Sequence, residues 1–307
     1  IIFIFFLSLF LWTNANSIIT AFKKGTYYEG DVYWKHKKIT LPTGKWETVE
    51  RWNWSIGFWT AGDVSLANHS NNYVNGFYGF GEIDFMGRYQ GYIAPYVEEW
   101  LYHNKHDGCY ERPEYTLLKL YKKGKVHNCF RVRHIDLHKE LYRPDDDESK
   151  WASAVLRKWI HDRNMEIPKI MLCAGGIYYA PVVRDTYYRW SYCIDPKKLG
   201  ATGAKFFTEE TSEYHPANIN NYPEKIKIMD EWKIITANMH KEIEKTLKAK
   251  KHHKLNFSEY NLLNINKTNE VTSDSSLAED IKALKQLYDD GALTKEEFEK
   301  TKSLLLN

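Results

Sequence analysis

The sequence predicts an α+β protein in which a β-rich core precedes a long amphipathic helix and a C-terminal two-helix hairpin. Three observations support this fold class. Apolar and polar residues alternate over much of residues 27–85, which is typical of strands with one buried face. Apolar residues recur every three or four positions from residue 223 to about residue 251, which is typical of a helix. The same spacing returns in two short stretches near the C-terminus.

Residues 18–222 are predicted to form the β-rich core domain. Turns are expected at Pro42-Thr43-Gly44 and at Asn71-Asn72. The strand between them places five large residues on one parity, which predicts a single buried face: Trp46, Trp52, Trp54, Ile56 and Phe58. Gly76, Gly79 and Gly81 do not form a phosphate-binding loop, because neither a Lys-Ser/Thr pair nor a helix follows them. Glycines in a strand indicate bulges or close backbone packing instead.

The second half of the core is predicted to hold a hairpin, a helix and two more strands. Residues 117–121 and 126–135 form the hairpin, with Phe130 and Val132 on one face and Arg131 and Arg133 on the other. A helix is expected after Pro144 and the acidic residues 145–148, since acidic residues suit a helix N-terminus. Residues 170–173 and 185–194 are expected to be strands.

Residues 1–17 are predicted to be a signal peptide. The run IIFIFFLSLFLW is apolar apart from Ser8 and is shorter than the ~20 residues that cross a bilayer. Thr13 and Ala15 then supply the small residues of a cleavage site, with Ala15 and Ser17 as an alternative pair. A signal peptide implies a periplasmic or secreted protein, and we expect this localisation. The other interpretations of the apolar run are an N-terminal anchor or a buried strand.

The cysteines are interpreted in the light of this expected export. The chain has four cysteines and no CxxC motif, which disfavours a zinc site and a thioredoxin-like motif. In an oxidising compartment they form disulfides, and local pairing would join Cys109 to Cys129 and Cys173 to Cys193. Four buried free thiols are the alternative.

Composition limits the function classes. A net charge of +3 is too small to indicate nucleic-acid binding. With 11 Trp and 22 Tyr, the chain could bind glycans through exposed Trp52, Trp54 or Trp59. A strand-rich core accounts for the same aromatic content. The sequence predicts no cofactor.

One group of weak catalytic candidates lies in the motif RHIDLH. On a strand, His134, Asp136 and His138 would share one face, as a metal-binding triad would require. A polar outer strand face accounts for them equally, and since no fourth ligand is identifiable we predict no metal site.

A second group lies in a loop before the long helix. Glu213 and His215, with Glu209 and Glu210 nearby, could supply acid–base groups. A Pro- and Asn-rich connector also needs polar residues simply to satisfy its own backbone. The sequence therefore leaves open whether the protein is an enzyme.

Residues 223–254 are predicted to form the long amphipathic helix. Pro223 suits its first turn. One apolar stripe would pack on the core: Ile226, Met229, Trp232, Met239, Ile243 and Leu247. Residues 255–275 are rich in Asn, Thr and Ser and are predicted to be a linker.

Residues 276–306 are predicted to form a helical hairpin. Leu277, Ile281, Leu284 and Leu287 make one apolar stripe, which ends before a glycine at 291. A capping box at residues 294–297 begins the second helix, whose apolar side is Phe298 and Leu305.

This stretch resembles the SHOCT domain, a short C-terminal domain appended to many bacterial proteins. The matching residues are Ile281, Leu284, Leu287, the Asp290-Gly291 turn, Leu293-Thr294, Glu296-Glu297-Phe298, Lys302 and Leu305. The resemblance implies a bacterial source and a non-enzymatic tail that mediates oligomerisation. We therefore expect a structural or interaction protein whose tail binds a second copy or another envelope protein. The alternatives are a periplasmic hydrolase and a glycan-binding module, both using the core.

Overall fold

The computed structural model describes most of the core and scattered residues of the tail. The described residues are 20–34, 37–56, 59–85, 114–122, 126–142, 150–180, 184–202, 208–248, 254–255, 285, 288–289, 295, 298–299 and 302. The chain divides into two compact units, residues 1–261 and 262–307. The first unit contains the sheets and the long helix.

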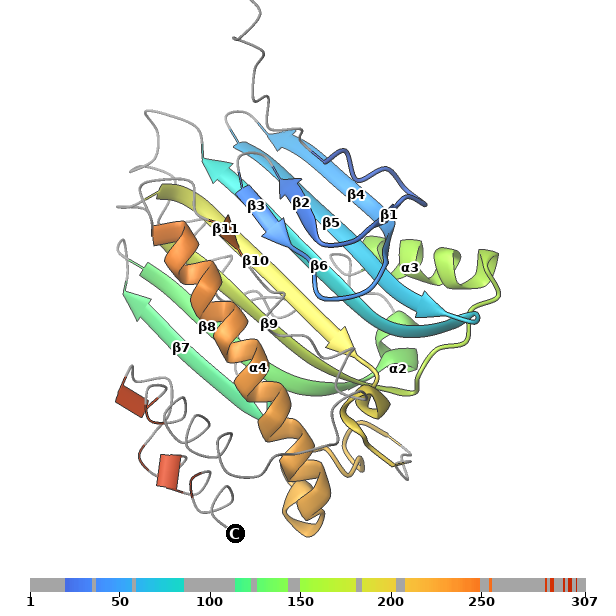
Figure 1. Cartoon of the computed structure of the whole chain (residues 1–307), viewed down its shortest axis with the longest axis vertical. Helices are drawn as coiled ribbons and strands as arrows, with labels where there is room; N and C mark the ends of the chain where they lie inside the picture. The colour runs from blue at the N-terminus through green and yellow to red at the C-terminus, as the bar shows by residue number, and fades with distance from the viewer. Residues whose placement is uncertain are drawn as a thin grey trace, which may run out of the picture. The chain divides into compact units, whose positions relative to one another are not determined.

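An eight-stranded antiparallel sheet dominates the first unit (Figure 1). Its strands, in spatial order, are β1 (Tyr27–Tyr28), β4 (Trp46–Ile56), β5 (Trp59–Ser70), β6 (Tyr73–Phe85), β10 (Arg184–Ile194), β9 (Ile170–Ala180), β8 (Val126–Asp136) and β7 (Thr116–Lys122). Strands β4, β5 and β6 are consecutive neighbours, and so are β7 to β10. Pairing of β6 with β10 joins these two meanders into one sheet.

Each face of this sheet carries different elements (Figure 1). Helix α4 (Pro223–Lys248) and a three-stranded sheet of β2 (Asp31–Trp34), β3 (Lys37–Thr40) and β11 (Lys254–Leu255) lie on one face, which we call the closed face. Helices α2 (Leu137–Leu141) and α3 (Lys150–Asp162) lie on the opposite face, which we call the groove face. Short 3-10 helices η2 (Pro196–Leu199) and η3 (Ile219–Asn221) precede α4.

Large aromatic side chains fill the closed face. Trp34 packs on Phe80 with ring centroids 5.6 Å apart, and Tyr192 packs on Trp232 of α4 at 5.0 Å. The predicted stripe of α4 is confirmed at Met229, Trp232, Met239 and Ile243, which are fully buried. Such burial removes apolar area from water and stabilises the docking of α4 on the sheet.

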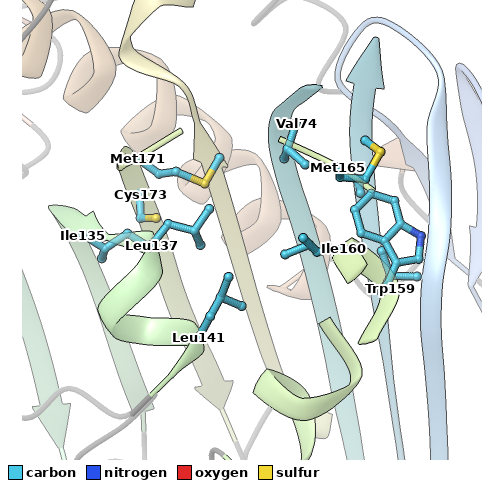
Figure 2. Close-up of a cluster of buried hydrophobic side chains, with 11 residues drawn as sticks. Val74, Ile135, Leu137, Leu141, Trp159, Ile160, Met165, Met171 and Cys173 are labelled. Carbon is cyan, nitrogen blue, oxygen red and sulfur yellow. The ribbon is translucent and has the colours of Figure 1, made fainter. Parts of the chain in front are cut away.

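A second apolar cluster lies under α2 and α3 on the groove face (Figure 2). Its side chains come from both meanders and both helices, and include Val49, Val74, Ile135, Leu137, Leu141, Trp159, Ile160, Met165 and Met171. Glu47 fixes the position of α3, since its buried carboxylate accepts hydrogen bonds from Trp159 Nε1 at 3.1 Å and from Arg163.

Most of the predicted strands and turns are confirmed. Asn71 and Asn72 both have positive φ (50° and 57°), as a tight turn between antiparallel strands requires. Strands β7 and β8 form the predicted hairpin, and Phe130 packs toward His240 of α4 while Arg131 and Arg133 line the opposite face.

The shared face predicted for the tryptophans of β4 is wrong. The β4–β5 register shifts between Thr48 and Glu50, and such a bulge turns the following residues over. Trp46 therefore packs on Tyr78 and Tyr192 of the closed face, whereas Trp52 lies on the groove face. The side chains of Trp54, Ile56, Phe58 and Trp59 lie outside the described residues.

The structure changes the predicted boundary after the long helix and describes a few residues of the tail. Lys254 and Leu255 pair in parallel with β3, so they are neither the end of the helix nor the start of the linker. In the tail, Lys285, Tyr288, Asp289, Lys295, Phe298, Glu299 and Lys302 are helical, and Tyr288 stacks on Phe298 at 5.0 Å. The signal segment, the rest of the linker and the remainder of the hairpin lie outside the described residues.

Candidate functional site

A row of small residues crosses the groove face of the large sheet. Ser65 pairs with Gly79, Gly79 with Ser191, Ser191 with Gly175, and Gly175 with Arg131. Directly paired residues point to the same side of a sheet, so these positions share one face. Because four successive strands carry only Ser or Gly in this row, the sheet backbone forms the floor of a groove.

The glycines of this floor are closely bounded. A Cβ at Gly175 would lie 2.9 Å from the carbonyl oxygen of Trp190, and one at Gly79 would lie 3.2 Å from Ser191 Oγ. Side chains at these positions would therefore disturb the neighbouring strand as well as fill the groove. The close packing of the neighbouring strands therefore favours glycine at positions 79 and 175.

One wall of the groove is an ion pair beside a tryptophan. Asp63 on β5 accepts a hydrogen bond from Arg189 Nε on β10 at 2.9 Å. The carboxylate lies over Gly81 of the intervening strand, where an added Cβ would be 1.7 Å from Asp63 Oδ1. Trp52 pairs with Asp63 and lines the same groove.

The opposite wall combines a disulfide, an aromatic ring and a second ion pair. Cys173 and Cys193 face each other on β9 and β10 with Cα atoms 4.1 Å apart and are joined as predicted. Phe77 is paired with Cys193, and Arg133 with Cys173. Arg133 Nη1 lies 3.6 Å from Glu140 Oε1 of α2.

The two helices add an apolar end. Leu137 and Leu141 of α2 and Val155 and Leu156 of α3 line the groove, and Leu137 and Leu141 are labelled in Figure 2. The groove has a volume of about 560 Å³. That volume falls within the roughly 300–1,000 Å³ of small-molecule sites, which are mostly apolar with a few polar groups.

The described lining is suited to binding and lacks a recognisable set of catalytic groups. It holds three guanidinium groups (Arg131, Arg133, Arg189) and two carboxylates (Asp63, Glu140), hence one more cation than anions. Each carboxylate is engaged by an arginine. The described lining residues include no histidine or lysine that could activate Ser65 or Ser191 as a nucleophile.

The predicted candidate His134 lies on the closed face, away from the groove. It is 4% exposed, and its Nε2 donates to the backbone oxygen of Glu209 at 3.1 Å. Burial lowers the pKa of His134 to about 4, so the imidazole is neutral at pH 7. The His215 ring lies edge-on to it at 6.0 Å, and Nδ1 of His215 accepts from the amide of Ala217.

The predicted shared face of His134, Asp136 and His138 is wrong, because β8 ends at Asp136. Asp136 is the N-cap of α2, where its carboxylate accepts from Lys139 N. His138 is already helical and stacks on Tyr142 at 4.5 Å. Within the described residues, no group of three or more His, Cys, Asp or Glu has the arrangement of metal ligands.

Glu213 belongs to the loop that connects to α4. Its carboxylate lies 3.5 Å from Nζ of Lys225, a lysine that is 2% exposed and also donates to the carbonyl of Thr202. The neighbouring Tyr214 ring faces the same ammonium at 5.4 Å. These contacts anchor the loop to the first turn of α4.

The remaining predicted residues are cysteines and tail positions. Cys129 is disulfide-bonded, and its expected partner Cys109 lies outside the described residues. Phe298 is half-buried and also lies beneath Lys302 Nζ at 5.7 Å. Leu277, Ile281, Leu284, Leu287 and Leu305 lie outside the described residues.

Apart from Trp52, Cys173 and Cys193, the described groove residues were not among the predicted sites. Arg131 and Arg133 were predicted to share one strand face, and Gly79 and Gly81 were predicted to lie in a strand, but a single sequence does not reveal that these strands lie in one sheet. The only usable signal was that small residues alternate with aromatics in Tyr78-Gly79-Phe80-Gly81. Buried His240 was also missed: Trp190 Nε1 donates to its Nδ1 at 3.1 Å, so its Nε2 donates to Asn128.

Comparison with known proteins identifies only the tail. Residues 279–306 match the model of the SHOCT family, described as Short C-terminal domain. The predicted resemblance is confirmed. Neither curated proteins nor solved structures gave a match to this chain. Among the described residues, no helix combines the length and the apolar character needed to cross a membrane.

Proposed function

We propose that this protein is an exported, non-catalytic binding protein that holds a small ligand in the groove of its core and assembles through its tail. The observation that carries the proposal is the floor of Ser65, Gly79, Ser191 and Gly175, which leaves a groove of about 560 Å³ between two polar walls. Binding is favoured over catalysis because both carboxylates of the described lining are engaged by arginines.

Export is supported by two independent features. Residues 1–17 have the apolar run and the small residues of a signal peptide. The Cys173–Cys193 disulfide is of a kind that persists in oxidising compartments. These features are consistent with a periplasmic or secreted protein.

A glycan is the second candidate ligand. Trp52 is partly exposed in the groove and lies beside the Asp63–Arg189 pair. The aromatic face of a tryptophan can stack on a sugar ring. The carboxylate and guanidinium groups beside it can hydrogen-bond the hydroxyls of that sugar. This feature favours a carbohydrate over a purely apolar ligand.

The binding function can be tested by filling the floor of the groove. Ser191→Leu adds an apolar side chain at an exposed position of the floor, whereas Ala217→Leu makes a similar addition in an exposed loop elsewhere. Native mass spectrometry after incubation with a small-molecule extract of bacterial envelopes should show bound mass on the wild type and on Ala217→Leu. Ser191→Leu should show none. Equal bound mass on all three proteins would rule out the groove.

Assembly can be tested separately by light scattering with and without residues 269–307. The match of residues 279–306 to the SHOCT family supports a tail that associates with another chain. We expect an oligomer for the intact protein and a monomer for the truncated one. If both are monomers, self-association is excluded and the tail must bind its own core or another protein.

A further inference from the structure

We propose that Tyr27, Glu47 and His69 form a metal site that binds ferric iron. The site is independent of the groove and of its ligand, because none of the three residues is among the described lining residues of the groove. The evidence is the set of distances between the donor atoms of the three side chains.

Three neighbouring strands bring these side chains together. Tyr27 of β1 pairs directly with Glu47 of β4, and Glu47 pairs with Ala67 of β5. Directly paired residues share a face of the sheet, and His69 follows Ala67 by two residues. Strands hold side chains more precisely than loops do, so the three donor groups are positioned before any metal arrives.

The three donor atoms form a nearly equilateral triangle. Tyr27 Oη lies 3.1 Å from Glu47 Oε2 and 3.0 Å from His69 Nε2, and that nitrogen lies 3.0 Å from the same carboxylate oxygen. Separate hydrogen bonds cannot occupy all three sides, because the phenol supplies one proton, Nε2 at most one and the carboxylate none. A metal ion above the triangle would contact all three atoms at once.

The size of the triangle fits octahedral coordination. Two ligand atoms about 2.1 Å from a metal and at right angles to each other are about 3.0 Å apart, whereas tetrahedral ligands at that distance are about 3.4 Å apart. Three protein ligands on one face of an octahedron leave the other positions for water or a small ligand. Solvent can reach them, because Tyr27 is 50% exposed.

The donor set favours ferric iron among ions of this geometry. Two of the three donors are hard oxygens, imidazole also suits iron, and tyrosine is a known iron ligand. Tyr27 would release its proton to solvent on binding, and His69 would bind through an unprotonated Nε2 with its proton on Nδ1. Tyrosine supplies the third donor, so this group differs from clusters made only of His, Cys, Asp and Glu.

Hydrogen bonds behind the carboxylate hold it in place. Glu47 is fully buried, and its Oε1 accepts from Trp159 Nε1 at 3.1 Å and from Arg163. The other oxygen, Oε2, is thereby directed toward Tyr27 and His69. The His69 ring packs edge-on against Trp159 at 5.6 Å. Such outer contacts orient the ligands of metal sites.

Titration of the full-length protein with ferric nitrilotriacetate at pH 7 tests the site. Wild-type protein should retain one ferric ion per chain after gel filtration, measured by mass spectrometry of the metal. Ligation by Tyr27 should produce phenolate-to-iron charge-transfer absorption in the visible range. A wild-type protein that retains no iron overturns the proposal. Displacement of the bound iron by an equimolar amount of zinc would overturn the assignment to an octahedral ferric ion.

Variants assign the bound iron to these residues. Tyr27→Phe should lose the visible absorption and bind iron at least tenfold more weakly, because it keeps the ring but lacks the donor oxygen. Tyr142→Phe is the matched control and should keep both, since Tyr142 is 56% exposed and its ring also stacks on a histidine, His138.

A third variant tests the imidazole. His69→Ala should weaken iron binding at least tenfold yet retain the absorption at saturating iron, because Tyr27 is still a ligand. Circular dichroism and urea unfolding midpoints verify that each variant is folded. Visible absorption that persists in Tyr27→Phe, or unchanged iron affinity in folded His69→Ala, would contradict the site.

Discussion

The two faces of the large sheet differ sharply although the same strands build both. On β6, Tyr78 and Phe80 point to the closed face, whereas Gly79 and Gly81 point to the groove face. On β10, Trp190 and Tyr192 alternate with exposed Ser191 in the same way. On β6 and β10, residues of one parity therefore pack in the core, and residues of the other parity form the floor of the groove, because successive residues of a strand point to opposite faces.

Polar groups differ between the faces as well. The closed face buries His134 and His240, and both imidazoles are hydrogen-bonded and neutral at pH 7, since burial lowers the pKa of each to about 4. The groove face instead carries the partly exposed Asp63–Arg189 pair. The titrating imidazoles should therefore make the closed face sensitive to acid, whereas ligand recognition should depend on the groove face.

The largest expected effect comes from opening the closed face. Trp232 of α4 is fully buried and packs on Tyr192 of the sheet. Trp232→Ala should therefore lower the free energy of unfolding by about 3–5 kcal/mol. Urea unfolding followed by circular dichroism measures the loss. On the groove face, Ser191→Ala should change the same free energy by less than ~0.5 kcal/mol. Similar losses in both variants would contradict the contrast between the faces.

The second-largest effect is expected from acid, which should lower the free energy of unfolding by protonating two buried histidines of the closed face. Both His134 and His240 have a folded-state pKa of about 4, below the ordinary 6.5, so the unfolded state takes up protons first. The stability they contribute is complete above pH 6.5 and is lost as pH falls toward 4, by up to roughly 3 kcal/mol for each histidine. Urea midpoints measured from pH 7 to pH 4 follow this loss.

A variant at position 240 measures how much one of these histidines contributes to the acid sensitivity. His240→Gln keeps a hydrogen-bonding side chain beside Asn128 and Trp190 but removes the titrating imidazole. The variant should be less stable than the wild type at pH 7, yet its stability should decline less steeply toward pH 4. An identical decline would show that His240 does not contribute to the acid sensitivity.

The smallest effect is expected from disturbing a wall of the groove. Gly81→Ala would place a Cβ 1.7 Å from Asp63 Oδ1, so the carboxylate must leave Arg189. We expect a loss of about 1–2 kcal/mol in the free energy of unfolding, because the ion pair is partly exposed. Asp63→Ala removes the clash, so Gly81→Ala should cost less in that background. A double-mutant cycle with no coupling would disprove this packing.

Local elements were predictable because their signals lie within a few residues. The Asn71-Asn72 turn, the β7–β8 hairpin and the start of α4 at Pro223 follow from turn chemistry, alternation and helix-start rules. The tail was recognisable because its motif is contiguous, and its match to the SHOCT family confirms it. The bulge in β4 was not predictable, since the register shift between Thr48 and Glu50 depends on pairing with β5.

By itself, the sequence determined the α+β class, the two faces of the β7–β8 hairpin and the family of the tail, and it offered Cys173–Cys193 as the local choice among the possible disulfides. Tertiary structure alone decided that β6 pairs with β10, because this contact joins segments more than a hundred residues apart. That pairing completes the floor of Ser65, Gly79, Ser191 and Gly175, and it brings Asp63 to Arg189. Local periodicity specifies which face of a strand a residue occupies, but the neighbouring strand decides what it meets there.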